Sequence, residues 1–213
     1  MIKACLFDLD GVVVDTAKYH YVAWKELANE LGFEFTEEHN ERLKGVSRMT
    51  SLDILLEIGG VELSDAEKEA MAQKKNDHYV SLISKMTPDE ILPGVEAFFQ
   101  TIKEAGLKIA LGSASKNAPT ILKQINMEHY FDAIVDGNSI TNAKPDPEVF
   151  LRGAELVGVD PSECVVFEDA QAGVEAAKAG GMFCIGVGEE SVLKQADFVI
   201  ATFNEMSLER LSF

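Results

Sequence analysis

The chain has 213 residues, 46% of them hydrophobic and 26% charged, so it can bury a substantial core as one domain with an insertion or as two small domains. Its 36 acidic and 19 basic residues give a formal net charge of −17, which argues against nucleic acid and anionic membranes as partners. No apolar run is long enough to span a bilayer, and the three cysteines lie singly in apolar runs, which predicts a protein of the reducing cytoplasm.

The first expected strand, residues 4–9, runs into the sequence Asp8-Leu9-Asp10-Gly11. Side chains alternate along a strand, so Asp8 and Asp10 leave it on the same side, and Gly11 lets the backbone turn away. Two carboxylates this close repel each other unless a divalent cation neutralises them, and open α/β sheets bind ligands beyond the carboxyl ends of their strands. The motif therefore predicts a metal and an anionic substrate, although Asp and Gly also form plain polar turns.

Residues 16–87 carry amphipathic helical patterns and almost no strand pattern. The helices are expected near residues 17–31, 39–43, 49–58 and 66–84. We interpret this segment as a helical cap domain inserted into a core domain formed by residues 1–15 and 88–213. The connections near residues 11–16 and 86–93 are expected to act as a hinge that closes the cap over the carboxylates and excludes water.

From residue 94 onward, short continuous apolar runs alternate with helical segments. The further strands are expected at residues 108–112, 133–136, 165–167, 183–187 and 198–201. The helices between and after them are expected at residues 95–105, 118–125, 148–157, 173–179 and 190–195. Continuous apolar strands that alternate with helices are typical of a parallel sheet covered on both faces. The predicted fold class is therefore α/β, with a Rossmann-like core of three α/β/α layers and an inserted α-helical cap.

Two further motifs follow expected strands and can hold an anion. Residues 112–117, Gly-Ser-Ala-Ser-Lys-Asn, open a helix, where a hydroxyl and free backbone N–H groups form an anion site. A plain serine N-cap has the same pattern. Lys144 precedes a proline-fixed turn, where its ammonium group can neutralise phosphate oxygens during transfer, although a lone lysine before a proline is often only solvated.

A last motif is acidic. Glu168 and Asp169 end the apolar run 164–167, and a structural N-cap explains only one of the two carboxylates. Acids at the ends of neighbouring strands can converge. With Asp8 and Asp10 they supply the hard oxygen ligands that Mg²⁺ prefers.

These four motifs, in this order, resemble those of the haloacid dehalogenase superfamily of phosphotransferases, and the resemblance covers essentially the whole chain. It implies that Asp8 attacks phosphorus to form an aspartyl-phosphate and that Asp10 acts as general acid and base. It also implies one Mg²⁺ per chain, with the ligands Asp8, the backbone carbonyl of Asp10, Glu168 and Asp169. The groups implied for the transferring phosphoryl group are Ser113, Ala114 and Lys144.

The expected cap contains a cationic motif at residues 44–51. Lys44 and Arg48 are four residues apart with Gly45 between them, which can place both cations on one side of a turn, with Ser51 as a nearby donor. Two solvated surface cations are the alternative. In so acidic a chain, the motif favours a second phosphate site, which a mutase needs for the far end of a bisphosphate.

This motif, together with His20, Trp24 and residues 75–77, resembles the cap of the hexose-phosphate mutases in the same superfamily. The resemblance implies interconversion of β-glucose 1-phosphate and glucose 6-phosphate, with glucose 1,6-bisphosphate as intermediate and activator. The implied substrate and phosphate contacts are Lys44, Gly45, Arg48, Ser51, Lys75, Ser113, Ala114, Ser115, Lys116 and Asn117. Thr16 and His20 are expected to tune Asp10, with simple helix-face packing as the alternative for His20.

Two other functions remain open at this point. A sugar-phosphate or phosphoglycolate phosphatase on the same scaffold would release inorganic phosphate. A phospho-acceptor signalling domain would also carry a strand-end Asp, but it has no use for Asp10 or for a cationic cap. We expect a monomer, because the sequence has no sustained heptad pattern and no long exposed apolar stretch.

Overall fold

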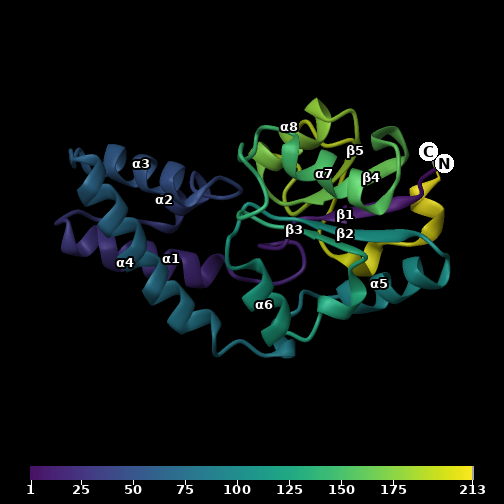
Figure 1. The fold of residues 1–213 in the computed structure, drawn as a ribbon, viewed down its shortest axis with the longest axis horizontal. Helices are drawn as coiled ribbons and strands as arrows, with labels where there is room; N and C mark the ends of the chain where they lie inside the picture. The colour runs from purple at the N-terminus through teal and green to yellow at the C-terminus, as the bar shows by residue number, and fades with distance from the viewer. Residues whose placement is uncertain (213) are drawn as a thin grey trace.

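The computed structural model describes residues 1–212, and one six-stranded parallel sheet organises most of them (Figure 1). The strand order is β3-β2-β1-β4-β5-β6. The strands are β1 (Ala4–Phe7), β2 (Lys108–Gly112), β3 (Ala133–Val135), β4 (Cys164–Glu168), β5 (Phe183–Val187) and β6 (Phe198–Ile200). Every residue of the central strands β1 and β4 is buried, which is why their sequences are apolar up to Glu168, the last residue of β4. The predicted α/β fold class is confirmed.

Helices cover both faces of the sheet, with α5 (Val95–Glu104) and α6 (Ala118–Gln124) on one face and α7 (Glu148–Val157) and α8 (Gln171–Ala179) on the other (Figure 1). Alternate residues of β1 enter two separate apolar clusters. Cys5 and Phe7 pack with α5 and α6, whereas Ala4 and Leu6 pack with α7 and α8. The period of two along a strand thus produces three layers.

Aromatic rings pack directly beneath the carboxyl ends of the two central strands. The Phe7 ring stacks on the Phe167 ring, with centroids 4.7 Å apart, and Phe7 and Phe167 are register partners. Phe99 of α5 lies 4.5 Å from Phe7, and Phe203 lies 5.2 Å from Phe167. This packing fixes the two strand ends relative to each other.

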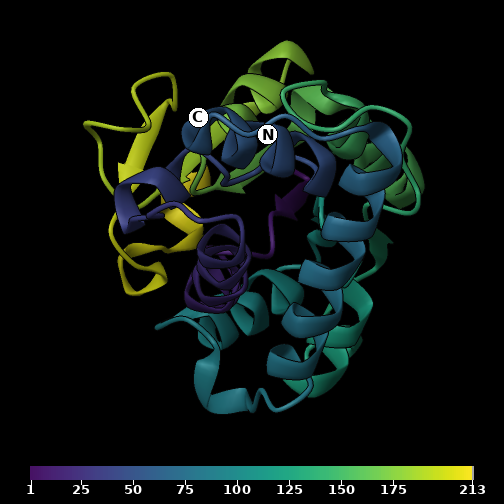
Figure 2. The same ribbon diagram turned by 90° about the vertical axis from the view of Figure 1, so that its left-hand side faces the viewer.

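Residues 17–83 form four helices beyond one end of the sheet, and Figure 2 views the molecule from that end. They are α1 (Ala17–Glu30), α2 (Glu37–Glu41), α3 (Arg48–Gly59) and α4 (Asp65–Ile83). Ser64 and Glu67 form a capping box that starts α4, and Gly60 ends α3 in the left-handed conformation. The helices share an apolar cluster of their own, which includes Trp24 and Leu55.

The two chain segments that connect α1–α4 to the sheet lie side by side. Val14 and Ile91 form an antiparallel bridge, and the backbone N–H of Leu92 donates to the carbonyl of Val13 at 3.0 Å. At the same place the Tyr19 hydroxyl donates to Glu90 at 2.6 Å. The two connections of the helical segment are therefore joined to each other by hydrogen bonds.

Three details differ from the expectations. The first strand ends at Phe7 instead of residue 9, because the N–H groups of Val13 and Val14 turn back to the Leu9 carbonyl. The expected helix at residues 190–195 is wrong: the segment forms turns, since the side chain of Leu193 packs onto Gly186 of the sheet and six residues are too few for a stable helix. Short 3₁₀ helices that were not expected occur at Pro88–Glu90, Glu128–Tyr130, Pro161–Glu163, Phe203–Glu205 and Leu208–Leu211.

Within residues 1–212, none of the helices combines the length and the apolar composition needed to cross a membrane. The longest, α4, has 19 residues, but charged and polar residues recur along it.

Substitution Phe99→Ala is expected to lower the free energy of unfolding by about 3–5 kcal/mol. The side chain is fully buried against Phe7, Tyr130 and Phe131, and the shortened side chain would leave a cavity. Urea denaturation measures the loss. Leu156→Ala is the control, because Leu156 is 60% exposed and its loss should cost little. Equal losses in the two variants would contradict this account of the core.

Candidate active site

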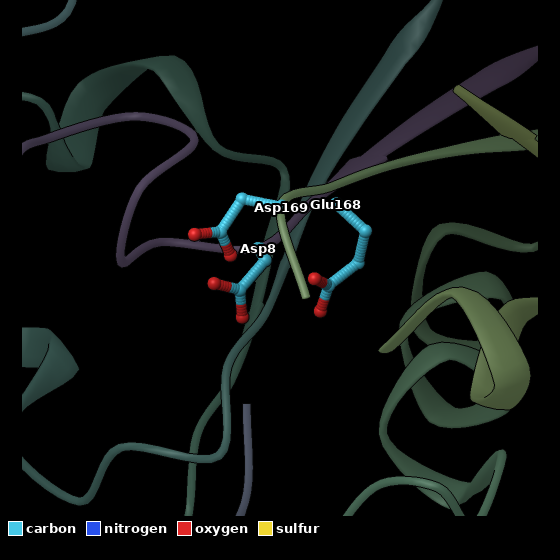
Figure 3. A group of neighbouring side chains, drawn as sticks. All are labelled: Asp8, Glu168 and Asp169. Atoms are coloured by element: carbon cyan, nitrogen blue, oxygen red, sulfur yellow. The ribbon is translucent and has the colours of Figure 1, made fainter. Parts of the chain in front are cut away.

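Three carboxylates meet where β1 and β4 end. Asp8 follows β1, Glu168 is the last residue of β4, and Asp169 follows it. One oxygen of each carboxylate lies within 4.8 Å of the others (Figure 3). Because β1 and β4 are neighbours in register, the packing of the two strands creates this group. The convergence that the sequence predicted for Asp8, Glu168 and Asp169 is present in the structure.

Two glycines make room for these carboxylates. A Cβ atom at Gly11, where φ is +82°, would overlap the carboxylate of Asp169, and one at Gly173 would overlap that of Glu168. Only glycine permits such close approach. A compact set of three hard oxygen donors fits a divalent cation of the Mg²⁺ type.

Lys144 holds two of the three carboxylates. Its Nζ lies 2.6 Å from Asp8 Oδ1 and 2.5 Å from Glu168 Oε1, and its side chain is fully buried. Burial alone would lower the pKa of Lys144, but the two carboxylates raise it above its ordinary value. Burial and the neighbouring carboxylates also raise the pKa of Asp169 well above its usual range. One ammonium group therefore does not balance the negative charge, which favours a further cation here.

The carboxylate of Asp10 does not belong to this group of three. The hydroxyl of Thr16 donates to it, and His20 Nε2 lies 4.0 Å from its Oδ1. Burial, followed by the charge of Asp8, raises the pKa of Asp10 to about 6. The simple strand argument, in which both carboxylates serve one point, fails because the chain already turns at residues 9–14. A contribution of the Asp10 carbonyl to a metal site stays a prediction.

A cavity of about 490 Å³ separates the ends of the strands from α1–α4. Asp8, Asp10 and Asp169 line one wall. The opposite wall contains the expected cap residues His20, Lys44, Gly45, Arg48, Ser51 and Lys75, and the expected loop residues Ala114, Ser115, Lys116 and Asn117 lie beside it. Thr16, Ser113, Lys144 and Glu168 are buried behind the wall, where they contact its residues or backbone.

The loop that follows β2 is held by its neighbour strand. The N–H of Ser113 donates to the carbonyl of Val135, and its hydroxyl accepts from the N–H of Ser115 at 3.1 Å. The N–H of Gly137 donates to the carbonyl of Ser115. These contacts orient the loop that presents residues 114–117 to the cavity.

A buried lysine occupies the cap wall. Lys75 Nζ lies 2.9 Å from His20 Nδ1 and above the rings of Trp24 and Tyr79, at 4.4 and 4.6 Å from their centroids. Burial, assisted by the charge of Arg48, lowers the pKa of Lys75 to about 7. Burial and the cations Lys75 and Arg48 lower the pKa of His20 well below 6.5, so His20 is neutral at neutral pH.

The two cations of the cap motif, Lys44 and Arg48, do not face the same point. Lys44 lies 3.9 Å from Asp169 Oδ2, toward the acidic group, whereas half-buried Arg48 opens α3. Gly45 lies against Ala170, the N-cap residue of α8. A Cβ atom at Gly45 would lie 2.9 Å from the Cβ atom of Ala170. The hydroxyl of Ser51 donates to the Leu43 carbonyl, so it supports the turn.

Sequence reasoning missed several residues of the wall, including an aromatic ring and a loop. Tyr79, stacked on His20 at 4.1 Å, lines the cavity and was not selected. The segment after β3, including Gly137 and Ile140, also lines it. Its signal was available, because a Gly-Asn turn follows a strand adjacent to β2 and thus ends at the same edge of the sheet.

A model of the haloacid dehalogenase-like hydrolase family matches residues 2–181. The chain belongs to this family. Three of its motifs follow the parallel strands β1, β2 and β4, and the fourth, Lys144, contacts Asp8 and Glu168 at the ends of β1 and β4.

Relatives of the chain include a mutase and a phosphatase. The β-phosphoglucomutase of Bacillus subtilis is 43% identical over 212 residues, which cover 99% of this chain and 94% of the relative. A phosphorylated carbohydrates phosphatase of Thermotoga maritima is 33% identical, with 85% of this chain and 82% of the relative covered. The crystal structure of β-phosphoglucomutase from Clostridium difficile matches with a TM-score of 0.94 and 45% identity, over 99% of this chain and 96% of that one.

The substitution Lys75→Met is expected to stabilise the protein by about 2 kcal/mol at pH 6. The folded-state pKa of Lys75 is about 7, below its ordinary value of 10.5. Folding therefore costs free energy at any pH at which the unfolded chain carries this lysine protonated. In the wild type, this loss of folding free energy is largest below pH 7 and decreases as the pH rises toward 10. The advantage of the variant should therefore shrink over that range.

Urea denaturation at pH 6, 8 and 10 measures this difference. Lys74→Met, which removes an exposed cation from the same helix, is the control for loss of charge alone. An advantage of Lys75→Met that is absent at pH 6, or that grows with pH, would refute the burial argument.

Proposed function

We propose that the chain is a β-phosphoglucomutase that interconverts β-D-glucose 1-phosphate and glucose 6-phosphate through β-glucose 1,6-bisphosphate. The observation that carries this proposal is the two-ended cavity. One wall presents a carboxylate nucleophile, and the other presents the cations Arg48 and Lys75. A phosphatase needs only the first end. Identity of 43% over 99% of the chain to a β-phosphoglucomutase supports the assignment.

In this reaction Asp8 is the nucleophile. One of its carboxylate oxygens forms a bond to phosphorus while the bond from phosphorus to the sugar oxygen breaks, and Asp10 gives its proton to that oxygen. In the reverse step Asp10 takes the proton of another sugar hydroxyl, which attacks the aspartyl-phosphate. Lys144, fixed between Asp8 and Glu168, neutralises charge on the transferring group. A pKa of about 6 suits Asp10 to both directions.

We propose Mg²⁺ as the resident cation. The residues that would hold it are Asp8, Glu168 and Asp169, with the carbonyl of Asp10. When bound, Mg²⁺ polarises the phosphoryl group and offsets its negative charge. The glucose bisphosphate then serves as intermediate and as the activator that phosphorylates Asp8.

We further propose that residues 16–87 move as a cap over a core of residues 1–15 and 88–213. The paired connections at Val14 and Ile91 support a hinge at this place. Closure would exclude water from the aspartyl-phosphate, which separates a mutase from a phosphatase. We also propose that the enzyme is monomeric and cytoplasmic and that it binds small sugar phosphates.

The second phosphate would lie between Arg48 of the cap and Ser115, Lys116 and Asn117 of the loop after β2. All four residues line the cavity. Arg48 offers a planar, bidentate donor set that matches phosphate oxygens.

Incubation of the purified protein with Mg²⁺, β-glucose 1-phosphate and a trace of glucose 1,6-bisphosphate should give glucose 6-phosphate with little free phosphate. Asp10→Asn should lower kcat at least about 100-fold, because general acid–base catalysis is lost. Coupled assays for glucose 6-phosphate and for phosphate measure both products. Rapid phosphate release without isomerisation would identify a phosphatase, and phosphorylation of Asp8 alone would identify a phospho-acceptor domain.

Arg48→Ala should raise KM for β-glucose 1-phosphate by about ten- to hundredfold, because a charge-assisted contact to the second phosphate is lost. Steady-state kinetics measure the change. Arg42→Ala is a matched control, since Arg42 is exposed and pairs with Glu57 at 3.1 Å. An unchanged KM in Arg48→Ala would place the second phosphate elsewhere.

A further inference from the structure

A hydrogen bond in the wall of the cavity joins two asparagines. Asn117 Nδ2 donates to Asn76 Oδ1 at 2.9 Å. Asn76 belongs to α4 and Asn117 immediately precedes α6, and the two helices are in contact. Both residues line the cavity. The bond therefore joins the helical segment 16–87 to the loop that follows β2.

The use of the Asn117 side chain is unusual for its position. An asparagine at the N-cap ordinarily accepts a hydrogen bond from the N–H of the second or third helical residue. Asn117 is the N-cap of α6, but its side chain makes no such bond. Pro119, at the second helical position, has no N–H to offer. The side chain is thus free of the helix and is directed to Asn76.

The backbone around Asn117 is fixed independently. Its N–H donates to the hydroxyl of Ser115 at 3.2 Å, and Ser115 is in turn bound through its N–H to Ser113. What remains to be set is the orientation of the amide group. An amide has two N–H donors, so one can bind Asn76 while the other faces the cavity.

We propose that Asn76 is a positioning residue that orients the Asn117 amide for the second phosphate group of the substrate. The bond forms only when the cap wall stands against the loop. It therefore links cap closure to a loop that is ready to bind that phosphate. The inference rests on the proposed function, because it assigns Asn117 to the second phosphate.

The experiment is a double-mutant cycle with Asn76→Ala, Asn117→Ala and the double variant. The readouts are the affinity for glucose 6-phosphate by titration calorimetry and the KM and kcat of isomerisation. Ser81→Ala is the matched control, because Ser81 lies on the same helix away from the cavity lining and its hydroxyl donates to the His78 carbonyl within that helix. Circular dichroism and urea denaturation confirm that each variant folds.

Asn76→Ala should weaken glucose 6-phosphate binding about three- to tenfold, with KM raised by a similar factor and kcat changed less. The double variant should bind no more weakly than Asn117→Ala, since Asn76 acts through Asn117. Ser81→Ala should stay within about twofold of wild type. If the two single effects multiply in the double variant, or if kcat falls while affinity holds, the proposal is overturned.

Binding distinguishes this failure from failure of the proposed function. A wild-type protein that binds glucose 6-phosphate but does not isomerise it would refute the mutase assignment, while the calorimetric cycle still tests Asn76. An active mutase with independent effects at Asn76 and Asn117 would refute the positioning role alone.

Discussion

The concentration of negative charge at the ends of β1 and β4 is the constraint on which the site depends. Three carboxylates, of which Asp8 and Glu168 are buried, lie within 4.8 Å of one another and repel strongly at low dielectric. Lys144 offsets part of this repulsion through two short contacts, from a position that solvent does not reach. A divalent cation and a phosphate group complete the balance of charge. The aromatic stack of Phe7 and Phe167 beneath the site keeps the strand ends from separating under that repulsion.

The two aspartates of the first motif also differ in the charged and polar groups that surround them. Asp8 shares Lys144 with Glu168, whereas Asp10 is turned toward Thr16 and His20. Because His20 is kept neutral by burial and by Lys75, it does not pull a proton permanently from Asp10. The two acids are two residues apart along the chain but occupy different electrostatic environments, as nucleophilic and proton-transferring carboxylates require.

Much of this arrangement is predictable from the sequence, because its signals are local. Continuous apolar runs such as residues 164–167, alternating with helical segments, are typical of buried parallel strands, and the polar residues that follow such strands meet at one edge of the sheet. Other features depend on contacts that no local pattern carries. The orientation of Asp10 follows from a turn at residues 9–14, and the segment 190–195 forms turns because Leu193 is needed against Gly186. The direction of Lys44 toward Asp169 depends on how the helices are placed against the sheet.

The pairing of the two connections at Val14 and Ile91 has a consequence for how such a protein can diversify. The entropy of closing a loop depends on the separation of its ends and only weakly on its length. Here the ends are already joined by backbone hydrogen bonds. The helical segment is therefore a loop whose closure adds little entropic cost to the folding of the sheet. Helices of other lengths and sequences can therefore replace this segment with little strain on the strands. The chemistry would be inherited with the sheet, while the choice of substrate could be exchanged with the insertion.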